Sequence, residues 1–152
     1  MADTYSVERS ATVPGSPQAV FDLLTDFHRW TEWSPWEDVD PNLQRRFSGA
    51  ASGVGAVYEW SGNKKAGQGR MEVTEATPAS KVAIKLDFLK PFKSSNVTTF
   101  TLTPEGAGTH VRWQMTGPRP LIMRIFGFAF NMDKLVGKDF EKGLDNLARA
   151  TG

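Results

Sequence analysis

The sequence predicts an α+β domain in which a curved antiparallel sheet wraps around one long C-terminal helix. Two observations carry this prediction. Between residues 43 and 117, apolar and polar side chains alternate with a period of two, as in strands with one buried and one solvated face. From residue 121 to residue 148, apolar side chains instead recur with the period of a helix. A sheet with one apolar face needs a cover, and only this helix is long enough to provide it.

The N-terminal part predicts one strand and two short helices. Residues 4–13 are rich in β-forming side chains and end at a Pro-Gly-Ser-Pro turn. Ser16 suits the N-cap of a helix, and Pro17 suits its first turn because that position needs no backbone N–H. Apolar spacing then predicts a helix over 17–26 and a second short helix over 27–33.

The alternating region predicts a run of strands joined by short turns. Turn sequences occur at 62–63, 77–78, 90–91 and 104–108, and such short links favour antiparallel hairpins. With the first strand, this gives about six or seven strands. The side chains expected on the buried face include Tyr58, Trp60, Met71, Val73, Val82, Ile84, Leu86, Phe88, Phe100, Leu102, Val111, Trp113 and Met115.

The predicted C-terminal helix carries one apolar stripe, which includes Met132, Val136 and Phe140. Three glycines interrupt it, each at a cost of about 1 kcal/mol relative to alanine. Gly143 lies on the stripe, which indicates close approach to the sheet or room left for a ligand. Gly137 lies off the stripe, and the sequence offers no explanation for it.

Composition restricts the classes of function. The 152 residues suit one domain over 1–152, and the absence of cysteine excludes disulfides and thiol chemistry. Because the N-terminus lacks the features of a signal peptide, we expect a cytoplasmic protein. A net charge of +1 without basic clusters argues against nucleic-acid binding. The most apolar stretch, 121–132, contains Arg124 and Asn131, so we expect no stable membrane insertion.

Several short motifs have simpler explanations than a cofactor or metal site. The glycine pairs at 53 and 55 and at 67 and 69 lack the strand–glycine–helix context of a nucleotide loop and indicate turns or bulges. The acidic segment 38–42 lacks the glycine and glutamate of a calcium loop. His28 and His110 fall on different elements, where surface or capping roles are expected. We therefore predict no metal and no cofactor.

The layout resembles the helix-grip or START-like (SRPBCC) superfamily, of the polyketide cyclase/dehydrase and lipid-transport type found as small bacterial proteins. The resemblance covers nearly the whole chain, through segments 16–21, 30–36, 53–63, 67–69, 132–134 and 139–144. It implies the helix-grip fold with a cavity between sheet and helix. It does not imply one reaction, because such folds host many functions.

Aromatic residues predict where a ligand would bind. The sequence holds five Trp and ten Phe, enough to line a cavity as well as fill a core. Trp33 and Trp36 lie in a connecting segment, where a closed core would not need such bulky side chains. The predicted lining residues are Trp33, Trp36, Tyr58, Trp60, Met71, Ile84, Leu86, Phe88, Phe100, Trp113, Met115, Phe128, Met132 and Val136. We place the entrance between the turn at 89–92 and the start of the long helix.

Three functions remain open at this point. The leading hypothesis is binding of a hydrophobic small molecule, such as a lipid, polyketide or aromatic metabolite. The second is an aromatase/cyclase-type enzyme acting on a polyketide-like substrate, for which Tyr58 and Asp133 are the only acid–base candidates. The third is a protein-interaction or regulatory module whose pocket is filled by its own side chains. The sequence does not indicate the oligomeric state.

Overall fold

The computed structural model describes residues 4–36, 40–63, 67–90, 93–118 and 132–152, with side chains of the last segment described from Val136 onward. The predicted α+β architecture is confirmed. Seven antiparallel strands form one sheet in the order β1-β7-β6-β5-β4-β3-β2. The strands are β1 (Thr4–Val13), β2 (Gln44–Gly49), β3 (Ala56–Ser61), β4 (Gln68–Thr77), β5 (Lys81–Lys90), β6 (Ser94–Glu105) and β7 (Gly108–Pro118). The helices are α1 (Pro17–Thr25), the 3-10 helix η1 (Phe27–Glu32) and α3 (Met132–Thr151).

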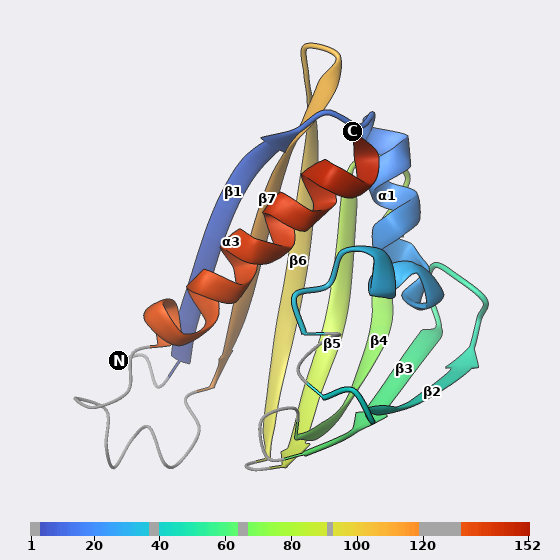
Figure 1. Cartoon of the computed structure of the whole chain (residues 1–152), viewed down its shortest axis with the longest axis vertical. Coiled ribbons are helices and arrows are strands. Elements are labelled where there is room, and N and C mark those ends of the chain that lie inside the picture. Colours follow the sequence, from blue (N-terminus) through green and yellow to red (C-terminus); the bar gives the residue numbers. More distant parts are fainter. Residues whose placement is uncertain (1–3, 37–39, 64–66, 91–92, 119–131) are drawn as a thin grey trace.

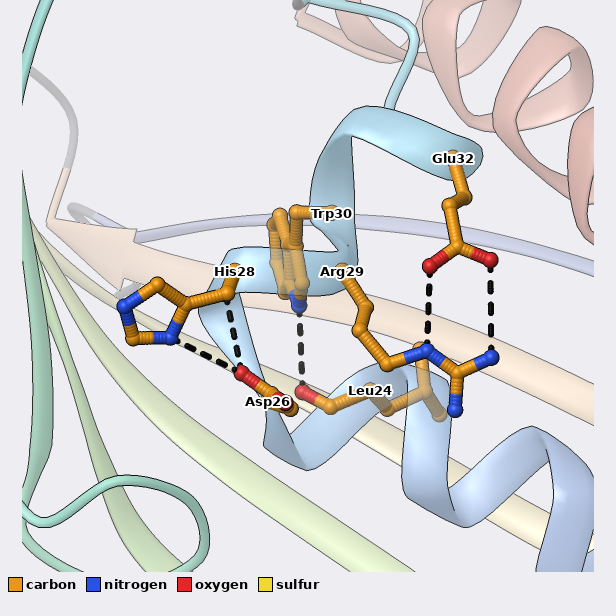
Figure 2. Close-up of polar contacts among 6 residues, drawn as sticks. All are labelled: Leu24, Asp26, His28, Arg29, Trp30 and Glu32. Carbon is orange, nitrogen blue, oxygen red and sulfur yellow. Dashed lines mark hydrogen bonds and ion pairs between the residues drawn. The ribbon is translucent and has the colours of Figure 1, made fainter.

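Local capping positions the two short helices over the sheet. The Ser16 side chain accepts a hydrogen bond from the backbone N–H of Ala19, and Pro17 follows it in the first turn of α1. Asp26 is extended and ends α1 one residue earlier than predicted. Its carboxylate accepts hydrogen bonds from both the backbone N–H of His28 (3.0 Å) and the ring Nδ1 (3.1 Å), so it starts η1 (Figure 2).

Two further contacts hold η1 in place. The Trp30 indole N–H donates to the carbonyl of Leu24 at 3.1 Å, which folds η1 back onto the end of α1 (Figure 2). Arg29 pairs with Glu32 on the exposed side at 3.0 Å. Because Phe27 and Trp30 are almost fully buried, η1 presents its aromatic side to the core and its charged side to solvent.

The strand registers place the predicted apolar side chains on one face. Buried residues alternate with more exposed ones along much of the inner strands, for example at Val111, Trp113 and Met115 on β7. The pairing of β4 with β5 shifts at 68–69 and again at 73–75. Such irregularities bend a sheet and increase its twist, which fits the curved sheet in Figure 1.

Helix α3 runs obliquely along the inner face of the sheet and ends close to α1 (Figure 1). It packs chiefly on β1, with Phe140, Leu144 and Leu147 fully buried. Two side-chain contacts join it to the segment after η1. The Trp36 indole N–H donates to Asp139 at 3.0 Å, and the Asn146 amide donates to the carbonyl of Trp33 at 2.9 Å. The helix predicted over 121–148 ends at Thr151, three residues further than expected. Its first part, 121–131, lies outside the described residues.

The helix glycines have different neighbours. A Cβ on Gly143 would lie 2.6 Å from the ring of Trp113, so the predicted close approach to the sheet is confirmed. A Cβ on Gly137 would collide with the guanidinium of Arg9. This arginine comes from the adjacent strand β1 and pairs with Glu141 at 2.9 Å. Gly137, which the sequence left unexplained, therefore makes room for an arginine that bridges strand and helix.

Candidate ligand-binding site

The inner face of the sheet is built from rows of side chains that run across the strands. One row joins Phe47, Tyr58, Met71, Leu86 and Asn96, which are paired in turn from β2 to β6. A second row joins Val73, Ile84, Thr98 and Met115, and a third joins Val82, Phe100 and Trp113. The predicted lining residues on the strands all belong to this buried face or pack against it. The strand registers on which the prediction depended are therefore confirmed.

An aromatic cluster occupies the third row, where α3 crosses the sheet. The rings of Trp113 and Phe140 stack with centroids 4.0 Å apart. Trp33 meets Trp113 edge-on at 5.5 Å and Phe100 at 6.0 Å, and Trp36 meets Trp113 at 5.7 Å. The indole N–H groups of Trp33 and Trp113 are buried, and no residue in the described ranges accepts a hydrogen bond from them. Edge-to-face packing places the positive edge of one ring against the negative face of another, which partly compensates for a missing acceptor.

Trp33, which the sequence places in a connecting segment, lies in the core. Only 1% of its surface is exposed, and its ring packs against Trp30, Phe100 and Trp113. The connecting segment after η1 thus turns inward and contributes to the core. Trp36 is half-buried and donates to the Asp139 carboxylate, which therefore ties α3 to that segment.

The other predicted aromatic residues lie in the first row and in the row beside it, where Gly69 pairs with Trp60 on one side and Phe88 on the other. Tyr58 is buried and contacts Phe47 and Phe27 edge-on, with centroids 5.2 and 5.8 Å away. Trp60 and Phe88 are half-buried and meet edge-on at 5.8 Å. The Trp60 ring lies over Gly69 of the next strand, where any Cβ would collide with it. This glycine therefore allows an aromatic ring to lie flat on the inner face.

A buried polar pair lies at the β1 side of this row. The hydroxyl of Tyr5 donates to the Oδ1 of Asn96, whose side chain lies over Gly117 of β7. Burial raises the pKa of Tyr5 to about 12, so its hydroxyl stays protonated at neutral pH. Neither residue is among those predicted from the sequence to line the site. Counting back by two from Phe100 reaches Thr98 and Asn96, and counting back from Val7 reaches Tyr5, so extending the alternation would have placed them on the inner face.

Several predicted residues lie outside the described parts of the chain. Phe128 and the Pro91–Phe92 part of the proposed entrance are among them, and the side chains of Met132 and Asp133 are not described. Leu89, beside that entrance, is 45% exposed, and Val136 is half-buried against the core. The entrance and the roles of Phe128, Met132 and Asp133 stay predictions.

A small pocket opens between η1 and the β2–β3 edge. It has room for about 120 Å³ and is bordered by Phe27, His28, Phe47 and residues 48–51 and 56–57. The imidazole of His28 stacks on Phe47 with centroids 4.1 Å apart. Drug-sized ligands usually occupy about 300–1,000 Å³, so this pocket suits solvent or a small fragment.

The motifs set aside in the sequence have structural roles. Gly53 and Gly55 adopt positive φ angles of 73° and 94° in the turn before β3, as the turn interpretation predicts. Asp40 is buried, and its carboxylate accepts hydrogen bonds from the backbone N–H groups of Asn42 and Asn63, both at 2.8 Å. Within the described ranges, no three His, Asp or Glu side chains gather closely enough to hold a metal ion. None of the described helices is long and apolar enough to cross a membrane.

Known proteins share this fold. The model of the family described as polyketide cyclase/dehydrase and lipid transport matches residues 4–152. A protein from Chromobacterium violaceum superposes with a TM-score of 0.69 at 15% identity, covering 96% of each chain. A protein from Mesorhizobium loti is 26% identical, with a TM-score of 0.65 over 95% of this chain and 98% of its own.

A third similar structure is DynU16, a protein from the dynemicin biosynthetic locus. It is 19% identical with a TM-score of 0.64, and the match covers 95% of this chain but 46% of DynU16. No curated protein shows significant sequence similarity to the chain.

Proposed function

Because the chain belongs to the polyketide cyclase/dehydrase and lipid transport family, we propose that it binds a hydrophobic small molecule between its sheet and C-terminal helix. A lipid, a polyketide or an aromatic metabolite has the required character. The observation that carries this proposal is the first row of the inner face, where Leu86, Met71 and Tyr58 stand side by side next to Trp60 and Phe88.

The proposed ligand would lie along this row rather than in the aromatic cluster. Trp113 stacks directly on Phe140, so a ligand there would have to displace packed rings. Trp60 and Phe88 are half-buried, so part of each residue is still accessible. Transfer of apolar ligand surface onto these rings would contribute roughly 25 cal/mol per Å² buried.

Two measurements test this function. Native mass spectrometry of the protein as purified should reveal a co-purifying small molecule, and titration with the fluorophore anilinonaphthalenesulfonate should show saturable binding. Trp60→Ala should weaken that binding, because it removes a half-buried ring from the proposed wall. Val97→Ala is the matched control, since Val97 is 46% exposed and lies on the opposite face of the sheet. Absence of a bound mass, together with equal fluorophore binding by both variants, would contradict the proposal.

A second candidate is cyclase-type chemistry, favoured by the likeness to a protein from a biosynthetic locus. Tyr58 is the acid–base candidate whose side chain is described, and it lies buried on the proposed ligand row. A phenol in that place could donate a proton to a ligand carbonyl during a dehydrating cyclisation. If so, Tyr58→Phe should retain a bound ligand whose mass is greater by one water than that of the product held by the wild type.

A further inference from the structure

Two polar side chains are buried where apolar ones would pack as well. Asn96 is 2% exposed and Tyr5 is 8% exposed, and both face the inner side of the sheet. Placing an amide in such surroundings without full hydrogen bonding costs roughly 1–3 kcal/mol. Phenylalanine and leucine would fill the same volumes without this cost. The pair therefore needs an explanation beyond packing.

The hydrogen bonds of the pair are incomplete. The Oδ1 of Asn96 accepts from the Tyr5 hydroxyl and, at 3.4 Å, from the Ser94 hydroxyl. Its Nδ2 donates to the carbonyl of Leu86 at 3.4 Å. An amide NH₂ group has two hydrogens, so one N–H of Asn96 has no acceptor among the described residues. The phenolic oxygen of Tyr5 likewise retains lone pairs that can accept a hydrogen bond.

The backbone is arranged to hold the amide in this position. A side chain at position 117 would collide with Asn96, and the sequence has glycine there. Asn96 is paired with Leu86, which is followed across the sheet by Met71 and Tyr58. With neighbouring strands about 4.8 Å apart, this row extends roughly 14 Å from Asn96 to Tyr58. The polar pair thus lies at one end of the apolar row described above.

We propose that Asn96 and Tyr5 form the polar end of the ligand site and bind an oxygen at one end of an otherwise apolar ligand. This inference rests on the proposed function. A ligand carbonyl accepts the spare N–H of Asn96. A ligand hydroxyl accepts the same N–H and also donates its own hydrogen to the oxygen of Tyr5. The site therefore selects apolar molecules of two or three rings' length that end in a hydroxyl or ketone over pure hydrocarbons.

The alternative is that the two residues only fix the register of β1 against β6 through the intervening strand. Such a role needs the bond between Tyr5 and Asn96 but has no use for the second N–H. It also makes a different prediction, because a purely structural pair would affect stability without affecting which ligands bind.

The test compares three probes with one ring system: ethylnaphthalene, acetylnaphthalene and naphthylethanol, each measured by displacement of anilinonaphthalenesulfonate. The wild type should bind the two oxygen-bearing probes more tightly than the hydrocarbon. Asn96→Leu should reduce the preference for ketone over hydrocarbon by roughly 5-fold, the worth of one hydrogen bond. Because only the alcohol donates to the Tyr5 oxygen, the wild type should also prefer the alcohol to the ketone, and Tyr5→Phe should remove this second preference.

Infrared spectroscopy gives an independent readout. The carbonyl stretch of bound acetylnaphthalene should lie at lower frequency in the wild type than in Asn96→Leu, since hydrogen bonding weakens the C=O bond. Should the leucine variant fail to fold, Asn96→Val replaces it with a smaller side chain suited to a strand. Thr109→Val is the matched control, because it removes a buried hydroxyl that donates to the carbonyl of Gly15 at 2.8 Å, near the opposite end of β7. It should lower stability and leave the probe preferences unchanged.

The outcomes separate this inference from the proposed function. If the wild type binds neither the fluorophore nor any of the three probes, both the proposed function and this inference are contradicted. If it binds all three probes, but Asn96→Leu and Tyr5→Phe leave their relative affinities within about 2-fold of the wild type, binding stands and the polar recognition is overturned. If Thr109→Val also loses the preference for the oxygen-bearing probes, the polar recognition is overturned as well, because the change in probe preference would then follow the loss of stability.

Discussion

The phenol of Tyr5 links burial at a single residue to the stability of the whole chain. Burial raises its pKa from 10.0 to about 12. The unfolded chain ionises Tyr5 near pH 10, whereas the folded chain keeps the proton until about pH 12. The contribution of Tyr5 to the free energy of unfolding is therefore fully present below pH 10. It is lost as pH rises to 12, because the unfolded state then binds fewer protons than the folded state. The total loss should be about 2–3 kcal/mol.

Urea denaturation of the wild type and of Tyr5→Phe at several pH values between 9 and 12 measures this loss. Every other titratable group is the same in the two proteins, so the difference between their stability curves isolates Tyr5. That difference should shrink or reverse with rising pH, since the phenylalanine variant has no proton to lose. Parallel curves across the whole range would show that the folded state does not raise the pKa of Tyr5.

Individual residues also show where sequence patterns stop being informative. Alternation predicted that Tyr58 and Trp113 face inward, because a strand in a one-sided sheet has only two choices for each side chain. It could not place Trp33, which follows a 3-10 helix and has no strand neighbours to set its direction. Asn96 and Tyr5 were overlooked because a polar residue on a buried face contradicts the pattern that identifies the face.

At the level of elements, the strands and the first helix were predicted closely. Their signals are local: alternation within each strand, turn residues between strands, and Ser16 with Pro17 at the start of α1. The contacts of α3 were not predictable in the same way. A helical wheel gives the buried stripe, but it does not show that Arg9 of β1 reaches across to Gly137. Such contacts depend on the register between elements, which local sequence does not encode.

The two helix glycines give a matched test of this packing. Glycine to alanine within a helix normally stabilises by about 1 kcal/mol. Gly143→Ala should instead destabilise by about 1–2 kcal/mol, because its Cβ would press on the Trp113 ring, which stacks against Phe140 and has no free direction to move. Gly137→Ala should be neutral or slightly stabilising, since the neighbouring guanidinium is the end of a flexible side chain.

Urea denaturation midpoints of the two variants measure the contrast. The Gly137 variant also displaces Arg9 from Glu141, but that ion pair is partly exposed and contributes little. Equal stabilisation by both alanines would mean that α3 lies further from Trp113 than the structure indicates. Equal destabilisation would mean that Arg9 is held as rigidly as the indole ring.

Across the whole molecule, the described parts of the inner face divide into two regions. Near the β6–β7 hairpin, α1, α3 and the aromatic cluster cover the sheet, as Figure 1 shows for the helices. Toward the other end lie the row from Asn96 to Tyr58 and the half-buried Trp60 and Phe88. The first region is occupied by stacked rings, whereas the second combines apolar side chains with one polar pair. A division of this kind separates the part that stabilises the fold from the part proposed to bind ligand.

This division predicts where a ligand changes hydrogen exchange. On addition of saturating acetylnaphthalene, backbone amides of 58–61, 68–71, 85–90 and 94–98 should exchange more slowly, because they flank the proposed site and opening them would release the ligand. Amides of 100–105 and 108–113 should change little, since the packed aromatic cluster already protects them. Hydrogen-exchange mass spectrometry resolves these segments as separate peptides. Slower exchange confined to the β6–β7 hairpin would place the ligand among the stacked rings and contradict this assignment. Uniform slowing across all strands would instead indicate stabilisation of the whole fold without a localised site.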